Sequence, residues 1–273
     1  MTFISYSQNF EDIRLWRALK FFENGFYVDV GANDPTIDSV TRAFYERGWS
    51  GINIEPVQQF HNALCLHRPN DTNLQCAAGD AEETRAFYDI PGTGLSTMDA
   101  GIARGHKEAG YEVQSRTVSS RTLTSICEEH VRGAIHFLKI DVEGHEESVL
   151  RGMDFKRWRP WIILIETPFN RDQRWEKIIT DASYHFVQFD GLNSFYLADE
   201  HLHLMGAFET PPSYLDNFQL CYGHHYSFPI TELESSLIAE KKRADLAETE
   251  LMMIKKSRSW RVVQLLKTLL FRR

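Results

Sequence analysis

The sequence predicts an α/β fold, in which a mostly parallel sheet carries helices on both faces and ends in an antiparallel hairpin. Three observations lead to this prediction. Short apolar runs rich in β-branched and aromatic residues alternate with segments of helical periodicity, as in a parallel sheet covered by helices. A glycine turn follows the first of these runs. A heptad pattern near the end of the chain adds a C-terminal helical extension.

The first half of the chain opens with a helix. Apolar residues at spacings of three predict a helix over 9–22, which Asn24-Gly25 ends. Apolar runs then predict three strands separated by turns and a helix near 39–47. We expect these strands at 26–30, 51–55 and 73–77.

The alternation is interrupted and then resumes. Glycine-rich loops between residues 87 and 118 accompany two expected accessory strands, at 85–90 and 113–118. After them we expect a helix at 122–130, buried strands at 135–140 and 161–165, and two final strands at 184–189 and 194–197. The segment Asp190-Gly191-Leu192-Asn193 between the final strands predicts their hairpin.

The chain is expected to have three parts: a globular domain over 1–228, a heptad-patterned helix over 229–254 and a basic amphipathic tail over 255–273. The heptad positions are apolar except for Glu240, which favours weak pairing with a second copy or packing against the body. The tail holds seven basic and no acidic side chains. It is typical either of a helix that binds a membrane surface or of one that docks on a partner.

Composition excludes several classes of protein. Hydrophobic residues make up 42% of the 273 residues and charged residues 25%, which is ordinary for a soluble globular chain. The net charge is −8 although the tail is basic, so the body is acidic and a nucleic acid partner is disfavoured. Four scattered cysteines without a Cys-x-x-Cys pair favour a reducing compartment. Without a signal-peptide or membrane-span pattern, we expect a cytoplasmic protein, with the inner membrane face as the tail's alternative location.

The strongest local signal is the glycine turn Val30-Gly31-Ala32-Asn33 after the first strand. Such a turn lets a ligand approach the backbone and aims amide groups at it. Glu55 closes the second strand, where a carboxylate can accept hydrogen bonds from both ribose hydroxyls of an adenosine-bearing cofactor. The predicted cofactor-binding residues are Asp29, Gly31, Asn33, Glu55 and Ala77.

The cofactor is expected to be S-adenosylmethionine (SAM). A nicotinamide-binding turn has a Gly-x-Gly-x-x-Gly pattern that clears space for a pyrophosphate, and here Ala32-Asn33-Asp34-Pro35 replaces its later glycines. SAM has no phosphates. A nicotinamide-dependent oxidoreductase and a non-catalytic SAM-binding scaffold remain the alternatives, whereas serine hydrolases and P-loop NTPases lack their motifs here.

A second group of polar residues follows two buried strands. Asp141 and Glu143 come after the strand at 135–140, and Glu166 follows the next one. Because ligands bind at the carboxyl ends of parallel strands, we expect these carboxylates to line an acceptor site. Asp141, His145 and Glu166 are the predicted catalytic residues, with Asp141 or His145 as the base.

Two further interpretations concern the same region. In one alternative, Asp141, Glu143 and Glu166 hold a divalent cation through their oxygen atoms. Whether or not a cation is bound, Glu143 and Ser96 are predicted to bind the acceptor. Ser96 lies in a glycine-rich loop.

Together these motifs resemble those of the FkbM family of SAM-dependent methyltransferases. The resemblance covers about residues 3–220 and rests on segments 6–8, 11–12, 29–33, 51–56, 92–97 and 137–146. It implies a Rossmann-like class I methyltransferase fold that O-methylates hydroxyl groups of sugars or polyketide-like acceptors. Many family members carry a glycine just beyond Asn33, where this chain has Asp34-Pro35. A weak similarity of segment 257–261 to enzymes of bacterial surface-polysaccharide assembly favours a sugar or glycan acceptor, carried on a lipid.

Overall fold

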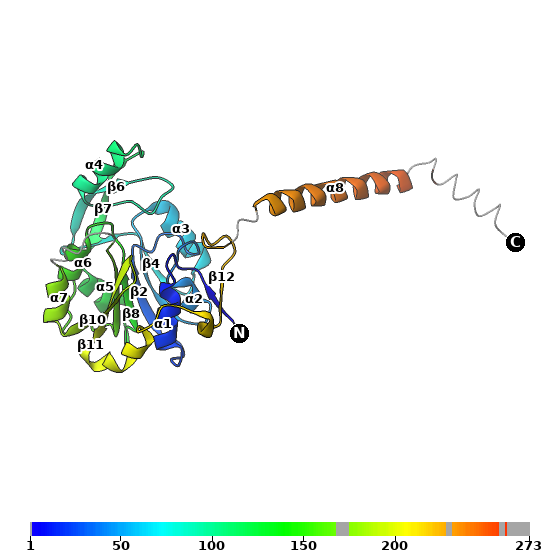
Figure 1. Cartoon of the computed structure of the whole chain (residues 1–273). Helices are drawn as coiled ribbons and strands as arrows, with labels where there is room; N and C mark the ends of the chain where they lie inside the picture. Colours follow the sequence, from blue (N-terminus) through cyan, green and yellow to red (C-terminus); the bar gives the residue numbers. More distant parts are fainter. Residues whose placement is uncertain (1, 168–174, 228–230, 257–259, 261–273) are drawn as a thin grey trace. The chain divides into compact units, whose positions relative to one another are not determined.

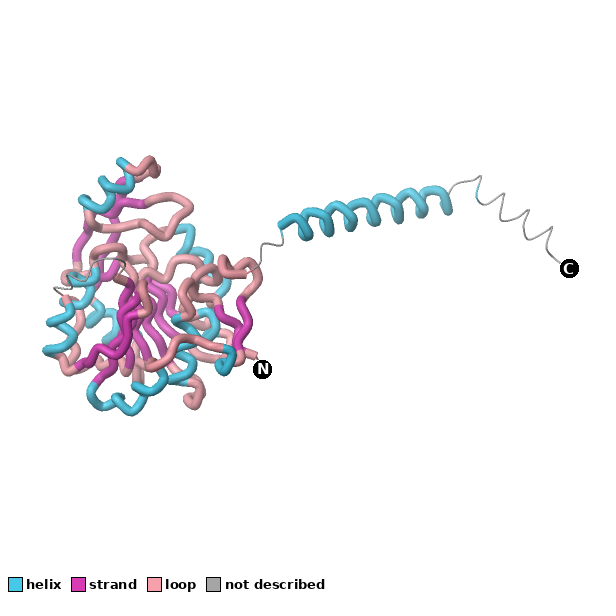
Figure 2. Tube along the Cα trace, in the orientation of Figure 1, coloured by secondary structure: helices cyan, strands magenta, loops and turns pink. Residues whose placement is uncertain are grey.

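The computed structural model describes residues 2–167, 175–227, 231–256 and 260. The chain forms two compact units, residues 1–224 and 225–273, which are described separately. Figure 1 traces the elements of both units, and Figure 2 shows strands at the centre of the first unit with helices around them.

A central sheet organises the first unit. Among the described residues it has seven strands in the order β10-β11-β9-β8-β2-β3-β4. Their bounds are β2 Phe26–Val30, β3 Ser50–Ile54, β4 Thr72–Leu74, β8 Phe137–Ile140, β9 Ile162–Glu166, β10 Tyr184–Phe189 and β11 Asn193–Ala198. The five neighbouring strands β9, β8, β2, β3 and β4 pair in parallel. Strand β11 runs antiparallel to both of its neighbours, β9 and β10. This mostly parallel sheet confirms the predicted α/β class.

Helices cover both faces of this sheet because its strands present apolar side chains on both sides. On one face the core joins Val28, Ile140 and Ile165 to helices α5 (Leu123–His130), α6 (Glu146–Arg151) and α7 (Glu176–Asp181). On the other face, Phe137 and Phe195 pack against α1 (Glu11–Leu19), α2 (Arg42–Tyr45) and the 3-10 helix η1 (Asp199–Ala207). Helix α3 (Gln58–His67) follows β3.

Two smaller sheets extend the first unit. Strand β1 (Phe3–Ser5) pairs in parallel with β12 (Phe218–Leu220), which follows the 3-10 helix η2 (Tyr214–Asp216). Strands β5 (Ala77–Ala78), β6 (Glu83–Asp89) and β7 (Gln114–Arg121) form the other sheet, and helix α4 (Ala100–Glu108) lies in the β6–β7 connection (Figure 1). The two accessory strands expected from the sequence are therefore present and pair with each other.

The predicted third strand differs in an instructive way. We expected one strand over 73–77, but β4 ends at Leu74 and the chain then leaves the central sheet. Ala77 instead pairs with Ser120 of β7. Cys76 and Ala78 are buried in the core that the central sheet shares with α5 and α6, so their apolar character reflects packing against that core and not membership of the central sheet. Local periodicity does not distinguish these two cases.

The second unit contains helix α8 (Thr231–Lys256). Heptad positions Leu237, Leu251 and Ile254 are solvent-exposed, and Ile230 lies outside the described residues, as does most of the predicted tail at 255–273. Pairing through this helix and membrane or partner binding by the tail stay predictions. None of the helices in the described residues is long and apolar enough to cross a membrane.

Candidate active site

A cavity of about 280 Å³ lies at the carboxyl ends of the central strands. Its walls come from the β2 turn, the end of β3, the segments after β8 and β9, and the loop that follows β6. Nine of the predicted site residues line it: Asp29, Gly31, Asn33, Glu55, Ala77, Ser96, Asp141, Glu143 and Glu166. The fold therefore brings together the cofactor-binding and acceptor-binding residues that the sequence placed at separate strand ends.

The sheet register explains this convergence. Adjacent strands align Asp29 with Asn53 and with Lys139, so these three side chains share one face of the sheet. Two residues further along, a second row crosses the sheet edge. The pairings place it, from β3 to β11, as Glu55, Gly31, Asp141, Glu166 and Asn193.

Lys139 is the cation that connects the two rows. Its ammonium donates a hydrogen bond of 2.7 Å to the Gly31 carbonyl oxygen. The same nitrogen lies 3.3 Å from a carboxylate oxygen of Asp29 and 3.3 Å from one of Asp141. Burial alone would lower the pKa of Lys139, but the neighbouring carboxylates outweigh it and raise that pKa. Lys139 therefore stays charged and holds β2 and β8 together at the cavity.

The turn at Gly31 requires glycine for two reasons. Its φ of +74° lies in the left-handed region that side chains rarely adopt. A Cβ atom there would also lie 1.8 Å from the Asp141 carbonyl oxygen, far inside any contact distance. The backbone of the turn consequently packs directly on the next strand. Asn33 is also left-handed, and its side-chain oxygen is buried without a hydrogen-bond partner among the described residues.

Glu55 connects the glycine turn to the start of the next helix. One carboxylate oxygen accepts a 2.8 Å hydrogen bond from the Asn33 amide, and the other accepts one of 2.7 Å from the Val57 amide. Burial raises the pKa of Glu55 to about 7. Each oxygen keeps a second lone pair, so the carboxylate can still accept hydrogen bonds from two hydroxyl groups.

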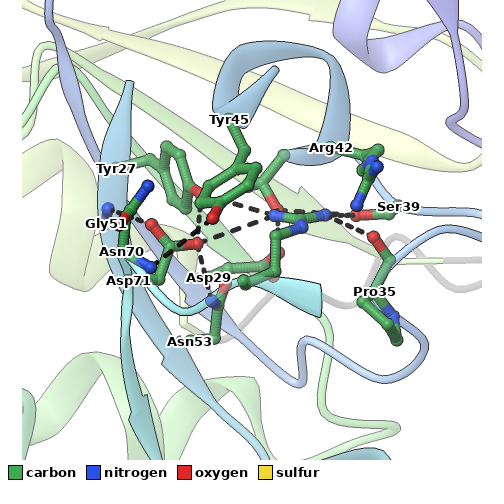
Figure 3. A network of polar contacts seen from close by, with 12 residues as sticks. Tyr27, Asp29, Pro35, Ser39, Arg42, Tyr45, Gly51, Asn53, Asn70 and Asp71 are labelled. Carbon is green, nitrogen blue, oxygen red and sulfur yellow. Dashed lines mark hydrogen bonds and ion pairs between the residues drawn. The ribbon is translucent and has the colours of Figure 1, made fainter. Parts of the chain in front are cut away.

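A buried arginine supports Asp29 from behind. The Thr41 hydroxyl donates a 2.9 Å hydrogen bond to Asp29 and accepts one of 3.2 Å from Arg68. The Arg68 guanidinium also donates to the Pro35 carbonyl oxygen at 2.6 Å and to the Ser39 hydroxyl at 2.9 Å. Figure 3 shows Asp29, Pro35 and Ser39 around this network. Arg68 thereby fixes the segment after the glycine turn.

The far end of the same network involves groups near the start of the strands. Asp71 lies 3.7 Å from Arg68 and accepts a 2.6 Å hydrogen bond from the Tyr27 hydroxyl (Figure 3). Arg68, Tyr27 and Asp71 were not anticipated from the sequence, because residues 68 and 71 follow a helix with no motif around them. Only the tertiary structure shows that this network connects to Asp29, which lines the cavity.

The acceptor side of the cavity is lined by three carboxyl groups, Asp141, Glu143 and Glu166. Burial and the adjacent Asp141, to which it hydrogen-bonds, raise the pKa of Glu166 to about 9. Burial and the same neighbour raise the pKa of Glu143 to about 7. The raised pKa of Glu143 brings it close to neutral pH, where a general base exchanges its proton readily.

The metal alternative is not supported by this arrangement. No group of three or more His, Cys, Asp or Glu side chains in the described residues is placed to hold a metal ion. The physical reason is that Asp141 already faces the Lys139 ammonium and shares a hydrogen bond with Glu166. The cluster is thus held by a lysine and by that hydrogen bond.

Two predicted residues have surroundings of their own. His145 does not line the cavity; its Nε2 atom lies 3.3 Å from the Arg85 guanidinium, and burial lowers its pKa. Ser96 does line the cavity, where its hydroxyl accepts a hydrogen bond from the Ile90 amide and donates one to Asp89. The geometry favours the carboxyl groups over His145 as the base.

The methyltransferase FkbM domain family matches residues 29–205. A methyltransferase FkbM structure from Methylobacillus flagellatus is similar, with 16% identity, a TM-score of 0.43, and coverage of 70% of this chain and 48% of that one. This chain thus spans about half the length of that protein. A TehB-like SAM-dependent methyltransferase from Corynebacterium glutamicum shows 8% identity, a TM-score of 0.37, and coverage of 69% and 88%. A search of the curated proteins finds no match.

Replacing Lys139 with methionine is expected to lower the free energy of unfolding by about 3 kcal/mol, because it leaves buried Asp29 without its cation. Urea unfolding followed by tryptophan fluorescence measures the change. Lys177→Met is the matched control, since Lys177 pairs with Asp181 in solvent and its loss should cost less than about 1 kcal/mol. Equal effects of the two substitutions would show that Lys139 does not hold the cavity edge.

Proposed function

The chain belongs to the FkbM methyltransferase family, and we propose that it transfers the methyl group of SAM to a hydroxyl group of a sugar or glycan. The observation that carries this proposal is the shared cavity. In it, the glycine turn and the Glu55 carboxylate lie with Asp141, Glu143 and Glu166, and burial raises the pKa values of Glu143 and Glu166.

The residues on the cofactor side suit SAM. The orphaned, buried oxygen of Asn33 provides an acceptor, and Glu55 can accept the ribose hydroxyls. Seven carboxyl side chains and one ammonium line the cavity among the described residues, which favours a ligand that carries a sulfonium and an ammonium. When bound, SAM supplies an activated methyl group.

The protein must then align the acceptor and remove its proton. A sugar hydroxyl is a weak nucleophile. A positioned base whose pKa lies near the working pH accelerates proton removal by about 10²- to 10⁴-fold. Glu143 has the pKa that this task needs, and Asp141 and Glu166 lie beside it to orient the hydroxyl. Lys139 keeps Asp141 in place.

Replacing Glu55 with glutamine should weaken SAM binding by about tenfold at pH 8, because one charged acceptor is lost. The pKa of Glu55 is about 7, so in the unsubstituted protein the ionised acceptor disappears as the pH falls from 8 to 6. The affinity of the unsubstituted protein for SAM should therefore decrease as the pH is lowered from 8 to 6. The affinity of Glu55→Gln should decrease less over the same range. Calorimetric titration at pH 6, 7 and 8 measures this, with the exposed Glu23→Gln as control. An unchanged affinity in Glu55→Gln would reject the ribose assignment.

Glu143→Gln and Asp141→Asn should each lower kcat by at least about 100-fold while SAM affinity stays within a few-fold. In the unsubstituted protein kcat should rise through pH 7 as Glu143 loses its proton, and Glu143→Gln should abolish this rise. The assay follows formation of S-adenosylhomocysteine (SAH), with glycans from cells lacking the gene as acceptor. Mass spectrometry then detects the gain of one CH₂ unit per transfer.

His145→Gln tests whether His145, one of the two bases predicted from the sequence, acts in place of Glu143. We expect His145→Gln to keep its activity and Glu143→Gln to lose it. The opposite result, an inactive His145→Gln and an active Glu143→Gln, would show that the base assignment is wrong. SAM binding without methyl transfer to any glycan would instead favour a scaffold function.

A further inference from the structure

One end of the cavity is built from residues outside the predicted cofactor-binding set. Gln8 and Glu11 precede residue 29, where the family match begins, and Asn193 opens β11. All three line the cavity. Together they are called the distal wall below.

The register places the distal wall on the side away from the cofactor residues. Asn193 is the β11 partner of Glu166 and continues the polar row beyond it. Neighbouring strands lie about 4.8 Å apart, so Asn193 is roughly 19 Å along the sheet edge from Glu55, four strands away. A nucleoside over β2 and β3 therefore leaves the β9–β11 end of the cavity for a second molecule.

The distal wall is held rigidly. Glu11 accepts a 2.7 Å hydrogen bond from the Asn193 amide group and one of 2.8 Å from the Asn9 backbone amide. Arg14 donates to the Asn9 carbonyl oxygen at 2.8 Å and lies 3.4 Å from Asp190. Glu11 and Asn193 are 2% and 4% exposed, so their positions are fixed before any ligand arrives.

The chemistry of this wall selects a class of ligand. A carboxylate oxygen that already accepts one hydrogen bond can accept another from a hydroxyl group, and Gln8 adds an amide with both donor and acceptor atoms. Lys139 is the one basic side chain among the described residues of the cavity wall, and Asp29 and Asp141 already face it. An anionic acceptor would thus find no unpaired cation among the described residues of the wall.

We propose that Gln8, Glu11 and Asn193 form the acceptor-binding subsite, and that it takes a neutral polyhydroxylated ring in preference to one bearing a carboxylate or phosphate. This inference rests on the proposed function, because it uses the methyl-transfer geometry to divide the cavity. It adds the residues that recognise the acceptor and the charge of the acceptor itself.

Saturation-transfer NMR with SAH bound tests the proposal. The neutral probes are the methyl α-glycosides of glucose, galactose, mannose and N-acetylglucosamine, and the anionic probe is the methyl glycoside of glucuronic acid. We expect at least one neutral glycoside to bind at least tenfold more tightly than the glucuronide. Glu11→Gln should weaken that binding at least tenfold without changing SAH affinity, whereas the exposed Glu23→Gln should leave both unchanged.

The remaining outcomes each decide the matter. If Glu11→Gln fails to fold, Gln8→Ala replaces it, since Gln8 is exposed to solvent and its loss should still weaken glycoside binding at least threefold. Three results, each with SAH still bound, would contradict the proposed subsite. They are glycoside binding that these substitutions do not change, tighter binding of the glucuronide than of the neutral glycosides, and no binding of any glycoside. Failure of the unsubstituted protein to bind SAH would instead contradict the proposed function.

Discussion

The buried ammonium of Lys139 is the interaction on which the site depends. It lies within 3.3 Å of Asp29 and Asp141 and bonds to the Gly31 carbonyl oxygen, so one cation fixes the ends of β2 and β8. Desolvating three charged groups is costly unless they remain paired. The chain meets this cost at the edge where parallel strands present their ligands. The glycine turn at Gly31 is thereby held in a fixed position relative to Asp141.

Polar side chains extend from this cation in two directions. On one side, Asp29 leads through Thr41 to Arg68, which fixes the segment after the glycine turn. On the other, Asp141 leads to Glu166 and then to the neighbouring strand. A single row of strand ends thus brings the predicted cofactor and acceptor residues into one cavity.

Sequence reasoning located residues best where their place follows from strand order. The positions of Gly31 and Glu55 at the cavity could be predicted because each follows an apolar run, and parallel strands bring such positions to one edge. The role of Lys139 was missed, although a lysine inside the apolar run Phe137–Ile140 was a visible signal. Glu11 and Asn193 lie 182 residues apart, so their contact depends on a register that local patterns do not encode. His145 is near Glu143 in sequence, but the left-handed backbone at Glu143 and Gly144 separates their surroundings.

The most direct test of the account is a crystal structure of the full chain with SAH. We expect the ribose hydroxyls to bond to Glu55, the nucleoside to lie over the Gly31 turn, and the sulfur to face the cluster of Asp141, Glu143 and Glu166. A complex in which SAH lies outside this cavity, or in which its sulfur points away from those carboxyl groups, would contradict the division of the cavity into cofactor and acceptor sides.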